Sequence, residues 1–258
     1  MFKLDYTQYA AAYDFYLKGP AFFPLIGAVL SSEQDGVVYG DARTAARRIY
    51  VEHAFGFAQV YGESGAAFDL ELKRYLLRDQ AFAAPKVRLY TPCLPAFLDD
   101  ARCEPLRSLR QRFLLDAKRF AATPRAAGDL AAITVDGARL DEVERIFGVV
   151  GRFWRGAADF LGKSNAVVVL HRGQPAALCY AAAAADRRAE IDVLTLPEYR
   201  RLGAGRLAVR HFVESCFRQS VAPVWDCFAN NLGSMHLARS AGFVAAAPPY
   251  PFFTITKS

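Results

Sequence analysis

The sequence lacks any long apolar run. Its longest uninterrupted apolar stretch, residues 176–185, has ten residues, whereas a membrane-spanning helix needs roughly 18 or more. We therefore expect no integral membrane protein. The first residues, MFKLDYTQY, carry no apolar segment after their lysine. This predicts the absence of a secretory signal and a cytoplasmic location.

Cysteine and histidine are also scarce. The five cysteines and four histidines are scattered, with no C-x-x-C spacing, so we expect neither a disulfide framework nor a metal site. Lysine supplies only seven of the 32 basic residues and arginine the other 25. Arginine suits bidentate contacts with phosphate, but a net charge of +6 over 258 residues is mild. Charge alone therefore does not indicate a nucleic-acid partner.

What the sequence has is enough apolar residues for a substantial core. The 258 residues are 53% hydrophobic, 13% aromatic and 22% charged, which excludes a disordered, collagen-like or coiled-coil chain. The length fits one large or two medium domains. Small residues with Pro and Gly at 121–129, AATPRAAGD, are typical of a break between domains. We therefore predict an amino-terminal α/β domain at 1–125 and a second domain at 126–258.

The amino-terminal half carries mixed α and β patterns but no chemical motif. Leu106, Leu109, Phe113 and Leu114 have helical spacing, which predicts a basic amphipathic helix over 106–120. The other expected elements are strands within 37–39, 48–60 and 86–90 and a helix over 68–77. The arginines of the basic helix could bind an acidic partner or form a solvated face.

The carboxyl-terminal half shows clearer alternation. We expect strands at 165–170, 175–184, 189–196, 221–228 and 250–256, and helices at 140–149, 153–161, 206–217 and 231–241. The run of alanines at 181–185 predicts close packing of a helix on the sheet.

The informative motif is Arg200–Gly205, RRLGAG, between a predicted strand and a predicted helix. Gly203 and Gly205 let the backbone approach a ligand closely. The helix behind them presents unpaired N–H groups, and Arg206 adds a further cation. This combination predicts an anion site that fits a pyrophosphate, although a plain glycine-rich turn has the same pattern. Neither the G-x-G-x-x-G spacing of dinucleotide folds nor a Walker loop is present.

Three stretches together resemble the GNAT superfamily of acyl-CoA N-acyltransferases. The first is Glu190–Gly205, EIDVLTLPEYRRLGAG, and the second is Val224–Cys227, VWDC. The third is Asn231 with Ser234, followed by Gly242–Phe243. The stretch at 153–180, FWRGAADFLGKSNAVVVLHRGQPAALCY, is similar to the branch that contains zwittermicin-type self-resistance acetyltransferases. The resemblance covers 139–258 and is thin before it.

The resemblance implies an α/β fold of mixed α+β type, with a central mixed sheet that splays open and is flanked by helices. It implies acetyl-CoA as co-substrate and no metal. The amino-terminal domain is then either a degenerate second copy of the fold or a lid on the acceptor side. The residues that the resemblance places against the acyl carrier are Val193, Leu194, Thr195, Arg200, Arg201, Leu202, Gly203, Ala204, Gly205, Arg206, Asn231 and Ser234.

The chemistry of acyl transfer to an amine requires a base, an oxyanion donor and a group for the leaving thiolate. Glu190 and Asp192 stand at i and i+2 of one predicted strand and so share a face. A carboxylate pair in an apolar cleft raises the pKa of one member, so either is a candidate base. Asp226 is a third carboxylate candidate. An N–H freed by a β-bulge could donate to the oxyanion.

The leaving-group donor departs from the family pattern. The position that usually carries a tyrosine acid is Ala238. Ser234, His236, Cys227 or a water could take its place, and we include Ser234 among the candidate catalytic residues.

Three function classes stay open from the residues. The first is an N-acetyltransferase acting by direct attack of a small-molecule amine, as a monomer or homodimer, without membrane or nucleic-acid partners. The second is a catalytically silent acyl-CoA sensor, which the alanine at 238 favours. The third is a nucleic-acid-linked acyltransferase that uses arginines 107–119 as a phosphate track.

Overall fold

The chain folds into two compact units in the computed structural model, which describes residues 1–123 and 129–257. One unit comprises Met1–Arg110 with Pro249–Ser258, and the other comprises Gln111–Pro248. The carboxyl-terminal strand therefore belongs to the amino-terminal unit. The boundary expected between residues 125 and 126 lies outside the described residues and stays a prediction.

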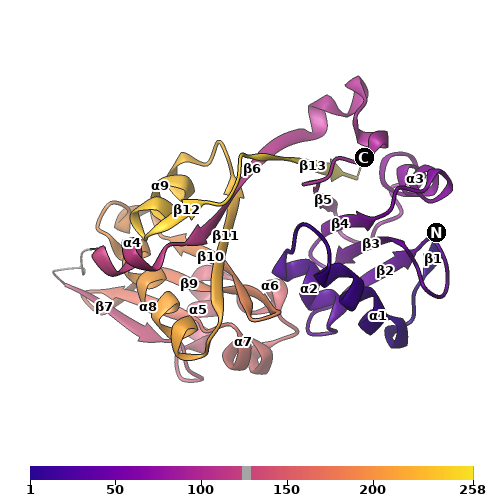
Figure 1. Ribbon diagram of the computed structural model, residues 1–258. Coiled ribbons are helices and arrows are strands. Elements are labelled where there is room, and N and C mark those ends of the chain that lie inside the picture. The colour runs from indigo at the N-terminus through magenta and orange to yellow at the C-terminus, as the bar shows by residue number, and fades with distance from the viewer. Residues whose placement is uncertain (124–128, 258) are drawn as a thin grey trace. The chain divides into compact units, whose positions relative to one another are not determined.

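The amino-terminal unit is built on a sheet with the strand order β1-β2-β3-β4-β5-β13. Neighbouring strands are antiparallel except β4 and β5, which run parallel. The helices lie between β1 and β2 and between β4 and β5 in the chain (Figure 1). The elements are β1 (Phe2–Lys3), α1 (Tyr6–Leu17), α2 (Pro24–Leu30), β2 (Gly36–Gly40), β3 (Arg48–His53), β4 (Phe57–Gly62), α3 (Ala66–Lys73), β5 (Lys86–Tyr90) and β13 (Tyr250–Thr256).

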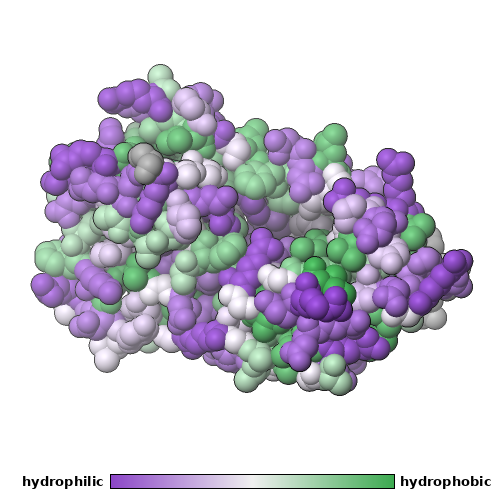
Figure 2. Space-filling model, turned by 180° about the vertical axis from the view of Figure 1, so that it is seen from behind, coloured by the Kyte–Doolittle hydropathy of each residue, from purple (hydrophilic) through white to green (hydrophobic). Residues whose placement is uncertain are grey.

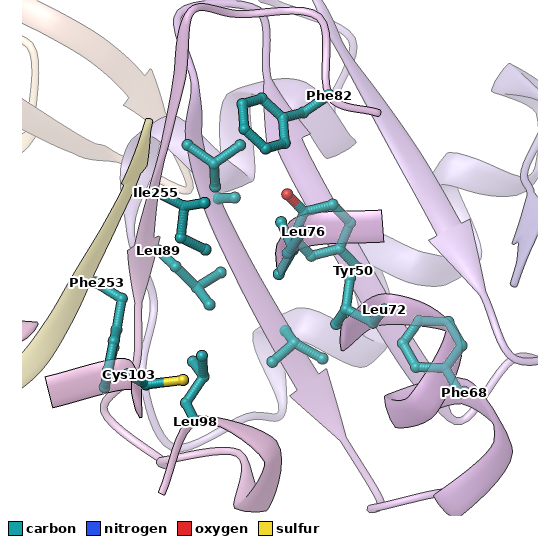
Figure 3. Packing of buried hydrophobic residues seen from close by; sticks show 13 residues of the cluster. Tyr50, Phe68, Leu72, Leu76, Phe82, Leu89, Leu98, Cys103, Phe253 and Ile255 are labelled. Atoms are coloured by element: carbon teal, nitrogen blue, oxygen red, sulfur yellow. The ribbon is translucent and has the colours of Figure 1, made fainter. Parts of the chain in front are cut away.

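The core of this unit joins α3 to one face of the sheet. Phe68 and Leu72 of α3 and Leu76 of the following π-turn, Arg74–Arg78, are buried with Tyr50 of β3 and Leu89 of β5 (Figure 3). Their i, i+4 spacing places these helical side chains on one stripe. The helical pattern expected at 68–77 is confirmed.

The helix expected over 106–120 is wrong. Arg107–Leu115 forms strand β6, and only Ala117–Ala122 is helical, as α4. β6 pairs with β13 through Arg107–Arg110 and with β12 (Phe243–Ala245) through its second half. Tertiary pairing overrides the helical spacing, so Leu109 and Leu114 are exposed while Phe113 is buried.

The carboxyl-terminal unit is built on the strand order β6-β11-β10-β9-β8-β7. Pairs β7–β8, β8–β9 and β9–β10 are antiparallel, and β10–β11 is parallel. The elements not yet given are β7 (Leu130–Thr134), α5 (Leu140–Phe147), α6 (Val150–Phe153), α7 (Ala157–Lys163), β8 (Val167–His171), β9 (Gln174–Ala185), β10 (Arg188–Thr195), α8 (Ala204–Arg218), β11 (Ala222–Phe228) and α9 (Leu232–Ser240).

Helices cover both faces of this second sheet. Successive strand residues point to opposite faces: Cys179 of β9 lies near Cys216 of α8, and Tyr180 packs against Phe160 of α7. α8 contacts β8, β9 and β10 (Figure 1). Ala181, Ala182 and Ala183 of β9 are buried and leave room for close packing, whereas Ala184 and Ala185 are half-buried. The predicted mixed α/β fold with helices flanking a mixed sheet is confirmed.

The surface mixes polar and apolar side chains. Figure 2 shows hydrophilic residues over much of one face, with apolar residues among them. Within residues 1–123 and 129–257, no helix is long and apolar enough to cross a membrane.

Candidate active site

Strands β10 and β11 part in the middle of the second sheet. Their parallel pairing runs from Arg188–Ala222 to Glu190–Val224 and then stops, although both strands continue for several residues. At the same level, β9 carries one extra residue, Ala182, opposite the step from Glu190 to Ile191. Bulges of this kind bend a strand away from its neighbour. The β10 edge at Val193–Thr195 therefore has no β11 partner.

The loop after β10 leads directly into α8. A single 3₁₀ turn, Pro197–Tyr199, precedes Arg201 and Gly203, which both adopt positive φ, 67° and 87°. The first helical hydrogen bond runs from Leu207 N to Gly203 O over 3.0 Å. The N–H groups of Ala204, Gly205 and Arg206 lie ahead of that bond. No side chain among the described residues caps this end of the helix.

Gly205 allows α8 to start against the end of β10. A Cβ on this residue would lie 2.7 Å from Thr195 Oγ1 and 3.4 Å from Leu237 of α9. The absence of a side chain at Gly205 therefore lets β10, α8 and α9 approach one another closely at this point. Gly203 is a glycine for a different reason. A Cβ there would meet nothing within 4 Å, but the positive φ favours glycine.

Positive charge surrounds this helix end. Arg200 and Arg201 are exposed and Arg206 is half-buried. Within the described part of the chain, no carboxylate pairs with any of the three. Three cations and three backbone donors at a helix N-terminus make an anion site.

A second group of candidate residues stands at the start of α9. Asn231 is its N-cap, and its Oδ1 accepts a 3.0 Å hydrogen bond from Ser234 N. The Ser234 hydroxyl accepts a 3.0 Å hydrogen bond from the indole N–H of Trp225, the first β11 residue beyond the split. Ala238 is completely buried one turn later, and His236 is exposed.

The carboxylates on β10 differ in their surroundings. Glu190 is buried, with 5% of its surface exposed, and is the last β10 residue that pairs with β11. Asp192 is half-buried and stands opposite Tyr180 of β9. Its Oδ2 accepts 2.7 Å and 3.3 Å hydrogen bonds from the Tyr180 hydroxyl and from Arg152. Burial raises the pKa of Tyr180 well above its usual range, so this phenol stays protonated and donates.

Sequence reasoning missed three residues of this region. Tyr180 is the one residue with a hydroxyl in the apolar stretch 176–185, and that contrast could have drawn attention to it. Arg152 gave no signal, because its partner Asp192 lies 40 residues away. Trp225 is a large aromatic residue of the kind that usually packs in a core, and it is buried, but its N–H reaches a candidate catalytic residue.

Several other candidates lie away from the split or lack suitable chemistry. His53 is buried in the other unit, bonded to Gln34 over 3.2 Å. Burial raises the pKa of Cys216 to about 12 and raises the pKa of Cys179 well above its ordinary value, so neither is a thiolate at neutral pH. Cys227 is also buried, and Asp226 is half-buried. Over residues 1–123 and 129–257, no group of three or more His, Cys, Asp or Glu side chains could hold a metal ion.

Comparison with known proteins agrees with this geometry. The sequence model described as GNAT acetyltransferase matches residues 131–253. Over this part, somewhat under half of its length, the chain is similar to the GNAT acetyltransferases. The family uses acetyl-CoA as acyl donor, and the point where β10 and β11 part lies inside the matched region.

One curated relative and many solved structures are similar. An uncharacterized N-acetyltransferase, YdfB of Bacillus subtilis strain 168, is 33% identical over 91 residues, which span 35% of each protein. A GCN5-related N-acetyltransferase-like protein from Streptococcus suis is 18% identical with a TM-score of 0.67, over 97% of this chain and 99% of that one. A tandem GNAT protein from the clavulanic acid biosynthesis pathway is 12% identical with a TM-score of 0.63, over 99% and 97%. These structures share the fold.

Proposed function

We propose that the protein is an acetyl-CoA-dependent N-acetyltransferase that acts on a small-molecule amine by direct attack. The observation that carries this proposal is the split between β10 and β11 beside the uncapped, arginine-flanked start of α8. A split in a sheet next to an anion site fits a long ligand with a phosphate end and a reactive end. The similarity of residues 153–180 to zwittermicin-type self-resistance acetyltransferases favours a small amine as acceptor.

The donor side of the site is proposed from backbone groups. The N–H groups of Ala204, Gly205 and Arg206 and the segment Arg201–Gly203 would hold the pyrophosphate. The side chains of Arg200, Arg201 and Arg206 would add charge-assisted contacts. Beyond Glu190, β10 has lost its β11 partner, so Val193, Leu194 and Thr195 can pair with the amides of the pantetheine arm. Asn231 and Ser234 lie at the N-terminal end of α9, as its N-cap and in its first turn.

We assign the two β10 carboxylates different tasks. The Asp192 carboxylate accepts hydrogen bonds from a phenol and a guanidinium, which hold it in place. It would orient the ammonium of the acceptor. Glu190, deeper and at the point where the strands part, would first take a proton from the ammonium, and the neutral nitrogen would then attack the carbonyl carbon. A β10 N–H that no longer pairs with β11 would donate to the carbonyl oxygen.

The amino-terminal unit is proposed to be a degenerate second copy of the same half-fold. In each unit one strand, β1 or β7, is followed by helices and then by three successive antiparallel strand pairings. A helix and a parallel strand follow in both, α3–β5 in one and α8–β11 in the other. The common order is the support for this interpretation.

This second copy lacks the features of a donor site. Its β4–α3 connection is only Glu63–Gly65, with no arginine. In the first turn of α3, Asp69 is buried against Arg48 through two hydrogen bonds of 3.0 and 3.2 Å. This carboxylate occupies the positive end of α3, where an anion would otherwise bind. We therefore expect one acetyl-CoA site per chain.

The test is release of free CoA, followed with a thiol reagent across a panel of small amines. We expect turnover with a subset of amines and its loss in Glu190→Gln, while Asp186→Asn, an exposed carboxylate at the β9–β10 turn, keeps it. Tight acetyl-CoA binding without CoA release for any amine would instead identify a silent acyl-CoA sensor. Absence of acetyl-CoA binding would overturn the proposal.

A further inference from the structure

We infer that Trp225 is a positioning residue that aims the Ser234 hydroxyl at the sulfur of the acyl donor. This inference rests on the proposed function, because it adds a leaving-group donor to that site. It concerns the position where the family's tyrosine is replaced by Ala238, which is completely buried.

The two side chains differ in their hydrogen-bonding chemistry. An indole N–H can only donate a hydrogen bond, whereas a hydroxyl can both donate and accept. Because Trp225 Nε1 lies 3.0 Å from Ser234 Oγ, the serine oxygen must be the acceptor of this bond. Its own proton must then point away from the indole.

That proton has no acceptor in the part of the chain that the structure describes. The hydrogen bonds of Ser234 are the one from Trp225 to its oxygen and the one from its own N–H to Asn231 Oδ1. Ser234 is half-buried, so its O–H remains available to a ligand. The hydroxyl is an oriented donor at the edge of the proposed acyl-donor site.

Both ends of this bond are fixed. Trp225 is 2% exposed and packs edge-on against Phe243 of β12, with ring centroids 5.5 Å apart. Ser234 sits in the first turn of α9, anchored by the Asn231 cap. Trp225 is also the first β11 residue after pairing with β10 ends, so the bond lies next to the point where the two strands part.

The step is hydrogen bonding and not full proton transfer. Glu190 takes one proton from the ammonium, the freed lone pair forms the C–N bond, and the C–S electrons leave on sulfur. The second N–H proton passes to solvent as the amide forms. A serine hydroxyl is far less acidic than a thiol, whose pKa is about 8.5, so the proton stays on Oγ. Ser234 stabilises the negative charge that builds on sulfur, and solvent protonates the thiolate on release.

The first test is kinetic. We expect Ser234→Ala to lower kcat about tenfold, as for loss of one hydrogen bond to a charged group. Trp225→Phe keeps an aromatic ring against Phe243 but removes the N–H, and we expect a severalfold loss. The double variant should be no slower than Ser234→Ala, and Ser234→Thr should restore most of the rate. The matched control is Ser240→Ala on the same helix, whose hydroxyl bonds Leu237 O over 2.9 Å.

The second test measures the pKa of the bound CoA thiol, which a change in packing alone would not shift. The thiol of enzyme-bound CoA is titrated by the ultraviolet absorbance of its thiolate. We expect its pKa to be about one unit lower in the wild-type protein than in Ser234→Ala or Trp225→Phe, with Ser240→Ala like wild type.

The two proposals fail differently. Bound CoA with the same thiol pKa and the same kcat in all variants would overturn the inference and leave the proposed function intact. A rise in KM for acetyl-CoA with kcat unchanged would also overturn it, because the hydroxyl would then hold the pantetheine arm. Failure of CoA to bind any of the proteins would overturn the proposed function itself.

Discussion

Gly205→Ala tests whether the start of α8 forms the donor site. The new Cβ would lie 2.7 Å from Thr195 Oγ1, about 0.7 Å short of ordinary van der Waals contact. Because the β-branched Thr195 has few side-chain rotamers to move into, we expect relief of this clash mainly through a shift of the first turn of α8 away from β10. We therefore expect the N–H groups of residues 204–206 to move by several tenths of an ångström.

The effect on stability is a small difference of two terms. Alanine in place of glycine inside a helix gains about 1 kcal/mol, and overpacking costs about 1–3 kcal/mol. The net loss is then about 0–2 kcal/mol, which leaves the protein folded. Lengthened hydrogen bonds to a charged pyrophosphate should weaken acetyl-CoA binding about tenfold.

Calorimetric titration with acetyl-CoA measures the affinity, and urea unfolding measures the stability. The matched control is Gly162→Ala in α7, where a Cβ meets nothing within 4 Å. That variant should gain up to about 1 kcal/mol and keep its affinity. Unchanged affinity in Gly205→Ala, with the control also unchanged, would refute the placement of the ligand at this helix end.

Three further predictions concern the loop, the base and the other unit. Gly203→Val, which forces a β-branched residue into a φ of 87°, should fold but lose acetyl-CoA affinity in the same titration, and an affinity equal to that of wild type would count against the loop. Glu190→Gln should lower kcat more at neutral than at high pH, where the amine is already neutral; a loss of equal size at every pH would remove Glu190 as base. Burial lowers the pKa of His53 from 6.5 to about 4, so the folded state keeps it neutral and stability falls as pH drops below 6.5 towards 4. Urea unfolding should show a loss of about 2 kcal/mol from this group between pH 7 and pH 5, and an equal loss in His53→Asn would contradict that assignment.

The second unit was more predictable than the first for a physical reason. Its strands carry continuous apolar residues bounded by clear turns. The loop before α8 combines glycines, which let the backbone approach a ligand, with arginines, which attract an anion. Strand β10 and helix α8 were therefore predicted to within two residues of their observed ends.

The predictions that were wrong or missing concern segments whose structure depends on contacts with residues far away in the sequence. β6 carries a helical spacing of leucines, but pairing with β12 and β13, more than a hundred residues away, makes it a strand. Helix α2, PLIGAVL, is buried at every residue, so it has no amphipathic pattern to detect. The return of β13 to the amino-terminal unit is likewise a long-range event that local patterns do not encode.

The candidate site shows the same contrast between local sequence patterns and long-range contacts. Glu190, Asp192, Asn231 and Ser234 stand in local patterns and could be selected from the sequence. The Tyr180 and Arg152 contacts with Asp192, and the indole donor to Ser234, join separate elements. They define what each group can do chemically, and only the folded chain brings them together.

Hydrogen exchange of the backbone amides, with and without acetyl-CoA, tests the central claim most directly. We predict slower exchange on ligand addition at Arg201–Arg206 and along Val193–Thr195, and no change at Glu63–Asp69 in the amino-terminal unit. Protection that appears at Glu63–Asp69, or that is missing from Arg201–Arg206, would contradict the account.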